Sequence, residues 1–303
     1  PRLFVNSVRD NVGGQLTTNG KLVFAVEAAT SEPLSADVDF RGIPSQKPVN
    51  YLRAYDVETG QLKGQAGGPV GVSAGGPVNP LAGMFFLGAP LVMGDRIYVI
   101  SENDQGIILL QLKATPLLDD DGQVDMRPVR SQLLSIPRNS LATHPVRRYA
   151  GVIPSYSGGL LICNTVDEQV IAISAEDHSL RWMYRYPGNV SIPELERGFA
   201  VLGNAYNAQQ SAAVDLASRW TDALPRIVAN RVYITPRDSD RLICLDLQTG
   251  KELWTRARGN MRNLAVVQPE RLVLTGQRSI ECLDAVTGEP IWNVDLEDGR
   301  ISG

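Results

Sequence analysis

The sequence predicts an all-β fold, a β-propeller built from four-stranded antiparallel blades. Two observations carry this prediction: a turn motif that recurs along the chain, and an apolar strand that recurs before the turn. Self-similarity at a period of roughly 40 residues is typical of propellers and related repeat folds. We therefore expect residues 1–303 to form a single propeller domain or part of one.

The turn motif has the pattern D-x-x-T-G and is followed by a Trp. In the copies that end at Trp254 and Trp292, the Trp stands eight positions after the Asp, and a degenerate copy keeps this distance from Ser174 to Trp182. The Asp can accept hydrogen bonds from turn amides, and the Gly can adopt the positive φ that a hairpin turn needs. The residues that we expect to define the blade motif are Asp56, Gly60, Trp182, Asp246, Gly250, Trp254, Asp284, Gly288 and Trp292.

The first copy of the motif is incomplete. Its turn runs from Asp56 to Gly60, but Gly64 stands where the later copies have Trp. The following stretch, Gly64 to Pro80, is rich in Gly, Pro, Val and Ser. We interpret this stretch as an irregular loop that crosses between blades.

The strand before each turn is apolar on both faces. In the fourth blade, Leu242 and Cys244 point to one side, whereas Ile243 and Leu245 point to the other. Such a strand must be covered twice, and blades stacked around an axis supply that cover. A turn residue followed by a β-rich strand marks each blade upstream, at Gly20, Asp95, Gly159, Asn230 and Glu270. Together these patterns place five blades near residues 12–66, 88–136, 149–187, 225–258 and 262–297.

Trp254 stands 72 positions after Trp182, which fits two blades or one blade with an insertion. We favour an insertion, because only one set of strands is readable there. Within residues 191–224, Ala205, Ala208, Ala212, Leu216 and Trp220 have the spacing of one amphipathic helix. Such a helix packs on its own propeller or binds a partner, and we favour the first.

Charge and hydropathy exclude several classes of function. The formal net charge is −4 with scattered basic residues, so the chain has no electrostatic footprint for nucleic acid or an anionic membrane. Apolar stretches such as Leu81 to Met93 are too short to span a bilayer, and we expect no transmembrane segment. The first ten residues have neither an initiating Met nor a signal pattern, which suggests a processed or excised piece of a longer product.

No catalytic or metal site is predicted. Cys163, Cys244 and Cys282 lie in apolar runs and are interpreted as small buried side chains. The acidic residues 119–121 and Asp125 lack the Gly and late Glu of a calcium-binding loop of the EF-hand type, which favours a solvated turn. His144 and His178 lie beside no evident nucleophile or carboxylate, and we expect both in solvent-exposed loops.

The pattern resembles the repeat of the quinoprotein (PQQ) alcohol dehydrogenase-like propellers, commonly A-x-D-x-x-T-G-x-x-x-W. The stretch from Phe85 to Val99 is also similar to large bacterial proteins with such repeats. The resemblance implies that Trp182, Trp254 and Trp292 pack between blades, largely buried, and it favours an extracytoplasmic location. Quinone-dependent members hold PQQ on the axis, commonly with calcium, a catalytic Asp and, in several, a disulfide between adjacent Cys. Adjacent Cys are missing here and no carboxylate matches those ligands, so we assign no cofactor-binding, metal-binding or catalytic residue.

Two functions remain open at this point. The first is a non-catalytic scaffold that binds a protein partner, and the alternative is a quinone-dependent oxidoreductase, or a fragment of one, using PQQ with calcium. Five blades are fewer than the eight typical of the resembled family. We therefore expect missing blades of a longer chain or a partner to cover the outermost blade faces, rather than the 191–224 insertion or closure into a smaller ring.

Overall fold

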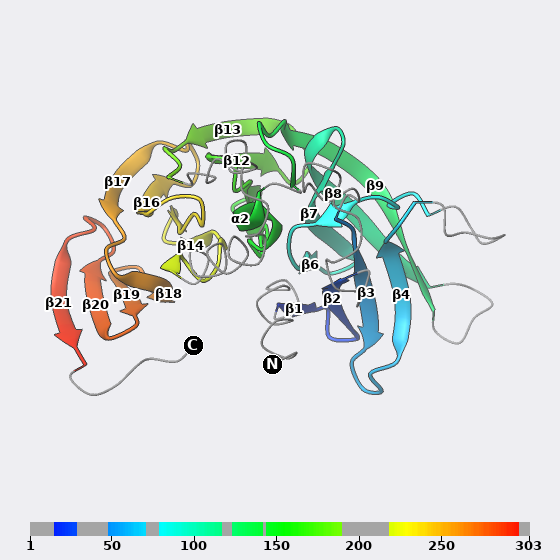
Figure 1. Ribbon diagram of the computed structural model, residues 1–303, viewed down its shortest axis with the longest axis horizontal. Helices are drawn as coiled ribbons and strands as arrows, with labels where there is room; N and C mark the ends of the chain where they lie inside the picture. The colour runs from blue at the N-terminus through cyan, green and yellow to red at the C-terminus, as the bar shows by residue number, and fades with distance from the viewer. Residues whose placement is uncertain are drawn as a thin grey trace, which may run out of the picture. The chain divides into compact units, whose positions relative to one another are not determined.

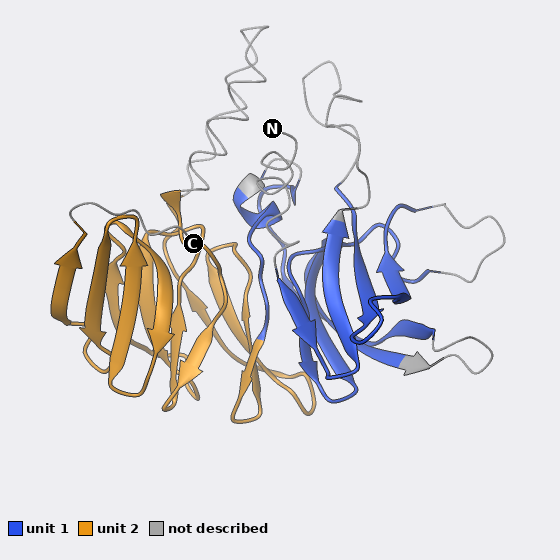
Figure 2. Ribbon diagram, turned by 90° about the horizontal axis from the view of Figure 1, so that it is seen from below, with its two compact units in different colours: residues 1–154, 192–206 blue, residues 155–191, 207–303 orange. Residues whose placement is uncertain are grey.

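The structure, a computed structural model, describes residues 15–28, 48–70, 79–116, 123–141, 144–189 and 218–296. Regular structure in these residues is almost entirely antiparallel strand, which confirms the all-β fold class (Figure 1). The chain divides into two compact units, with the described residues up to Pro154 in the first and those from Ser155 in the second (Figure 2). None of the helices in the described ranges is long and apolar enough to cross a membrane.

The first sheet of the first unit is a four-stranded meander. Its strands are β1 (Leu16–Thr18), β2 (Leu22–Ala28), β3 (Asn50–Asp56) and β4 (Leu62–Gly67), hydrogen-bonded in that order. The interpretation of Gly64–Pro80 as a loop was therefore wrong for its first residues, which belong to β4. Gly64 pairs with Ala54, and a methyl group on Gly64 would lie 2.6 Å from the carbonyl oxygen of Val124 in β9. The neighbouring sheet thus fills the space that a Trp would need.

The second sheet has five strands because its first strand is broken in two. Both β5 (Phe85–Phe86) and β6 (Leu91–Met93) pair with β7 (Arg96–Asn103), which is followed by β8 (Gly106–Pro116) and β9 (Val124–Ser135). At the break, the Val152 amide donates to the Leu87 carbonyl at 2.9 Å. A methyl group on Gly88 would lie 2.2 Å from the carbonyl oxygen of Val152. The approach of this later segment, which follows the short helix α2 (Pro145–Arg148), displaces the strand.

The two sheets of the first unit pack face to face. One apolar cluster joins them, with Phe24 and Leu52 from the first sheet and Val99 and Leu110 from the second. All four side chains are buried.

The second unit consists of three consecutive four-stranded meanders. The first is β10 (Ser155–Ser157), β11 (Leu160–Asn164), β12 (Gln169–Ser174) and β13 (Leu180–Arg185); the second is β14 (Arg226–Val228), β15 (Arg231–Ile234), β16 (Arg241–Asp246) and β17 (Glu252–Ala257); the third is β18 (Met261–Val267), β19 (Arg271–Gly276), β20 (Ser279–Asp284) and β21 (Pro290–Asp295).

Strand β16 is covered on both faces, as its sequence predicts. Ile243 and Leu245 pack in a cluster with the β10–β13 sheet, whereas Leu242 and Cys244 pack in a second cluster with the β18–β21 sheet. The β10–β13 and β14–β17 sheets therefore pack directly on each other. Most of the predicted helix within 191–224 falls on residues 191–217, which lie outside the described residues. Trp220, the last residue of the predicted helical pattern, is described, and its side chain is buried.

Candidate functional site

The D-x-x-T-G turns share one hydrogen-bonding pattern. Asp246 Oδ1 accepts hydrogen bonds from the amide of Gln248 at 3.1 Å and from the amide and hydroxyl of Thr249, both at 2.8 Å. These bonds hold the pKa of the Asp246 carboxyl below its usual value, and the bond from the Thr249 hydroxyl has the largest effect. Asp56 and Asp284 make the same contacts in their own turns.

The degenerate copy in the third blade keeps the turn with weaker contacts. Ser174 Oγ accepts from the amides of Glu176 and Asp177, each at 3.4 Å, in place of the carboxylate. The Ser hydroxyl therefore takes the position of the Asp carboxylate, but its hydrogen bonds to the turn amides are weaker.

The three Trp residues occupy the same register position in their sheets. Each pairs with a small residue of the preceding strand, and a register shift follows that pair every time. The pairs are Trp182 with Ala172, Trp254 with Cys244, and Trp292 with Cys282.

Two of these Trp residues pack on the turn Gly of the next blade. A methyl group on Gly250 would lie 2.4 Å from the Trp182 ring, and one on Gly288 would lie 2.7 Å from the Trp254 ring. Both glycines also have positive φ, +67° and +76°. The motif thus requires Gly for the turn and for the approach of the indole ring.

The indole nitrogen repeats a second contact across the same interfaces. Trp182 Nε1 donates to the carbonyl of Leu247 at 2.8 Å, and Trp254 Nε1 donates to the carbonyl of Ala285 at 3.3 Å. Tyr233 also donates to the Ala285 carbonyl, at 2.9 Å. The residue after the motif Asp is therefore the acceptor for the preceding blade.

The expectation that all three Trp side chains are largely buried was wrong for Trp292. Trp182 is 8% exposed and Trp254 is half-buried, but Trp292 is 44% exposed. All three Trp residues lie on the last strand of their sheets, but the rings of Trp182 and Trp254 are covered by the turn Gly of the following sheet. No turn among the described residues covers its ring.

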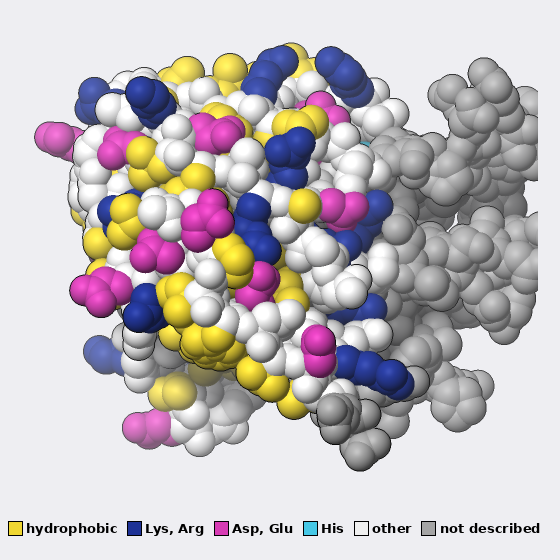
Figure 3. All heavy atoms as spheres, turned by 90° about the vertical axis from the view of Figure 1, so that its left-hand side faces the viewer, with side chains coloured by type: hydrophobic (Ala, Val, Ile, Leu, Met, Phe, Trp, Pro, Cys, Tyr) yellow, Lys and Arg dark blue, Asp and Glu magenta, His cyan; other side chains and the backbone are white. Residues whose placement is uncertain are grey.

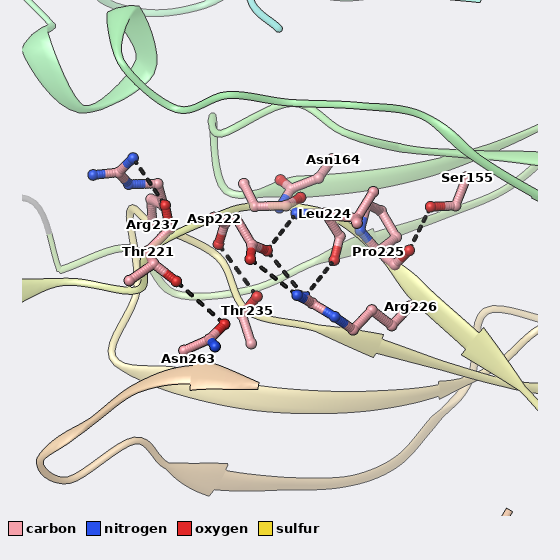
Figure 4. Close-up of polar contacts among 11 residues, drawn as sticks. Ser155, Asn164, Thr221, Asp222, Leu224, Pro225, Arg226, Thr235, Arg237 and Asn263 are labelled. Atoms are coloured by element: carbon pink, nitrogen blue, oxygen red, sulfur yellow. Dashed lines mark hydrogen bonds and ion pairs between the residues drawn. The ribbon is translucent and has the colours of Figure 1, made fainter. Parts of the chain in front are cut away.

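A network of polar contacts lies among the loops that lead into β14 and β16 (Figure 4). The Asp222 carboxylate accepts from the Leu224 amide at 3.1 Å and from both terminal nitrogens of Arg226 at 3.0 Å. The Asp222 carbonyl accepts from the hydroxyl of Thr235 at 3.3 Å. The Arg237 guanidinium donates to the Thr221 carbonyl at 3.4 Å. These contacts fix the segment before β14 to the loop between β15 and β16.

Asp238 is a buried carboxyl that joins two neighbouring blades. It accepts from the Glu168 amide at 2.9 Å and from the Tyr186 hydroxyl at 2.8 Å. Burial raises the pKa of Asp238 to about 6 and raises the pKa of Tyr186 well above its usual value. Burial also lowers the pKa of Arg237, the adjacent residue, to about 10. Sequence reasoning missed this network because its members are up to 70 residues apart.

The prediction that His144 and His178 are solvent-exposed was wrong, since both side chains are buried. His144 Nδ1 accepts from the Arg147 amide at 3.0 Å, and the Arg147 guanidinium binds Glu102 through two bonds of 2.6 and 3.1 Å. His178 takes the motif Gly position with φ +60°, and its amide donates to the Ser174 carbonyl at 3.0 Å. Both histidines therefore belong to folded turns.

The cysteines are free and buried, as predicted. Burial raises the pKa of Cys163 and of Cys244 to about 12. In the described part of the chain, no group of three or more His, Cys, Asp or Glu side chains could hold a metal ion. The acidic residues 119–121 lie outside that part, and Asp125 pairs with Arg127.

A groove of about 510 Å³ lies on the first unit, beside the first motif turn. Its charged lining mixes both signs, with Lys21 and Lys63 against Asp56 and Asp95. This balance selects neither an anionic nor a cationic ligand.

A comparison with protein families settles the relationship of the chain. Residues 123–260 and 208–302 match the family model described as outer membrane protein assembly factor BamB, and together these ranges exceed half of the chain. The chain belongs to this family. The predicted resemblance to quinoprotein-like repeats is thereby confirmed, since BamB-family chains share that repeat.

Three individual proteins that are similar to this chain share little sequence identity with it. The BamB of Burkholderia pseudomallei is 24% identical over 152 residues, which is 46% of this chain and 33% of that protein. The alignment thus spans one third of that relative's length. The structure of BamB from Moraxella catarrhalis has a TM-score of 0.48 at 15% identity, covering 95% of this chain and 77% of that one. A quinohemoprotein alcohol dehydrogenase from Comamonas testosteroni has a TM-score of 0.47 at 13% identity, covering 93% and 42%.

Proposed function

We propose that this BamB-family chain is a non-catalytic assembly module that binds protein partners outside the cytoplasm. The observation that carries the proposal is the family match over 123–260 and 208–302, because the matched family is named for outer-membrane protein assembly. The repeat motif itself supports a scaffold, since its residues pack blades rather than contact a reaction centre.

The buried charged groups support the same function. Arg147 and Glu102 bind each other, and Asp238 binds an amide and a phenol from a neighbouring blade. A buried charge is expensive unless it is paired and hydrogen-bonded, and these pairings join segments that are distant in sequence. A structural role, which is to hold blades and loops in place, therefore explains why these charged groups are buried.

The proposal is tested in the bacterium that produces the protein. We expect depletion of the chain to lower the amount of folded outer-membrane proteins, measured by heat-dependent migration in gels, and the tagged chain to fractionate outside the cytoplasm. Complementation with wild type should restore these proteins, and Trp182→Ala should restore them poorly because its blade interface is damaged. Tyr156→Ala, which alters an exposed ring of the same sheet, is the matched control. Unchanged outer-membrane proteins after depletion would contradict the proposal.

A further inference from the structure

Residues 220–225, which we call the strap, contact three sheets of the second unit just before β14 begins. In the β10–β13 sheet, the side chains of Ser155 and Asn164 donate hydrogen bonds to strap carbonyl groups (Figure 4). In the β18–β21 sheet, the carbonyl of Arg262 accepts from the strap amide of Thr221 at 2.8 Å. The β14–β17 sheet packs between these two sheets, so the strap links the sheets on either side of it.

Trp220 anchors the strap in a blade interface. Hydrophobic side chains on the β21 side of the molecule lie among acidic and basic ones at the surface (Figure 3), whereas Trp220 is 1% exposed and packs in the cluster shared by the β14–β17 and β18–β21 sheets. Its Nε1 donates to the carbonyl of Arg241, the first residue of β16, at 3.0 Å. Trp254 closes the other end of this interface, where it donates to Ala285 just beyond β20. Two indole rings therefore fill opposite ends of one interface, and Trp220 lies outside the repeat motif.

The neighbouring interface closes the same end in a different way. There the aromatic side chain is Tyr186, which stands four positions after Trp182 and is buried between the β10–β13 and β14–β17 sheets. The equivalent position after Trp254 is Arg258, whose guanidinium lies over the Trp220 ring, 5.9 Å from its centre. A cation over an indole face is a favourable contact. The aromatic ring that closes this end is thus supplied by the strap rather than by the last strand of the sheet.

The Asp222 carboxylate fixes the conformation of the strap. It accepts from the Leu224 amide within the strap and from the Arg226 guanidinium at the start of β14. The Asp222 carbonyl accepts from the hydroxyl of Thr235, which follows β15. Asp222 therefore stands between the Trp220 anchor and the carbonyl groups that bind the β10–β13 sheet.

We propose that the strap is a conformational clamp that makes the three sheets of the second unit open together. With the strap in place, the β18–β21 sheet separates from the β14–β17 sheet only when the Trp220 ring leaves their interface and the bond from Thr221 to Arg262 breaks. Once the strap is released, the β18–β21 sheet opens by itself, because local opening follows the contacts that join one element to the next. The clamp does not depend on the proposed function.

Hydrogen exchange of the chain, measured by mass spectrometry of peptides from each sheet, tests the clamp. In the wild type we expect the slowest amides of β11, β16 and β19 to report the same opening free energy, because the three sheets open together. In Trp220→Ala the slowest amides of β19 should exchange at least about tenfold faster than those of β11, since truncating a buried Trp removes a large packing contribution. Exchange that speeds up equally in all three sheets, or in none, would overturn the proposal.

Asp222→Ala tests the strap with the Trp220 ring intact, and it keeps the test valid if Trp220→Ala does not fold. We expect the slowest amides of β19 to exchange about three- to tenfold faster than those of β11, because hydrogen bonds that fix the strap are lost. Combined with Trp220→Ala, its effect should be smaller than in the wild type, since both changes release the same strap.

Asp177→Ala is the matched control. Like Asp222, Asp177 accepts from the amide two positions on, that of Ser179 at 3.0 Å, and pairs with the Arg four positions on, Arg181 at 3.7 Å. It lies in the turn between β12 and β13, outside the strap. Asp177→Ala should leave β11 and β19 with equal opening free energies. The clamp is overturned if Asp222→Ala leaves them equal as well, or if Asp177→Ala separates them as Asp222→Ala does.

Discussion

Gly250→Ala tests the packing of one blade on the next. The new methyl group would lie 2.4 Å from the Trp182 ring, and the backbone must keep φ near +67°. A positive φ costs an L-residue about 1–2 kcal/mol, and overpacking a filled interface costs about 1–3 kcal/mol. We therefore expect the free energy of unfolding to fall by about 2–5 kcal/mol.

Gly259→Ala is the matched control, because Gly259 has φ +61° with no atom within 4 Å of the new methyl group. The free energy of unfolding of Gly259→Ala should fall only by the cost of the positive φ, about 1–2 kcal/mol. Urea unfolding followed by circular dichroism measures both variants. Equal losses in Gly250→Ala and Gly259→Ala would refute the role of the Trp182 contact. A combined Gly250→Ala and Trp182→Ala variant should lose less than the two single losses together, since removing the ring removes the clash.

Three further predictions follow from burial and pKa. Truncating the motif Trp residues to Ala should lower the free energy of unfolding most at Trp182, less at Trp254 and least at the exposed Trp292, with a loss of about 3–5 kcal/mol at the buried Trp182. An equal loss at all three positions would contradict the difference in burial. Because burial raises the pKa of Asp238 to about 6, the folded chain retains a proton that the unfolded chain releases near pH 4. Stability should therefore fall as the pH rises from about 4 to about 6, and urea midpoints of Asp238→Asn should lack that slope; an identical slope would exclude Asp238 as its source. The thiols should be inert toward a thiol reagent in the folded chain and react after denaturation; a thiol that reacts in the native protein would contradict the buried positions of Cys163, Cys244 and Cys282.

The blades were predictable because their signals are local. The spacing from Asp246 to Trp254 lies within one hairpin, and its repeat ending at Trp292 lies within another. Four consecutive residues of β16 supply the apolar side chains of both of its faces. Turn chemistry and strand periodicity then suffice to place the sheets.

The remaining features depend on contacts between distant segments. Nothing near Gly64 shows that β9 occupies the space of the missing Trp, so the sequence predicts a loop from Gly64 onward, where the structure continues β4 to Gly67. Nothing near Asp238 shows that Tyr186, 52 residues away, donates to it. The exposure of Trp292 has the same cause, since the motif specifies the position of the ring but not whether a turn covers it.

The most direct test of a non-catalytic function is a titration of the purified chain with PQQ in the presence of calcium. We predict an unchanged quinone absorbance spectrum, no saturable binding, and no reduction of an electron-accepting dye with alcohols or sugars as substrates. Stoichiometric quinone binding accompanied by substrate-dependent dye reduction would contradict the account and establish the oxidoreductase alternative.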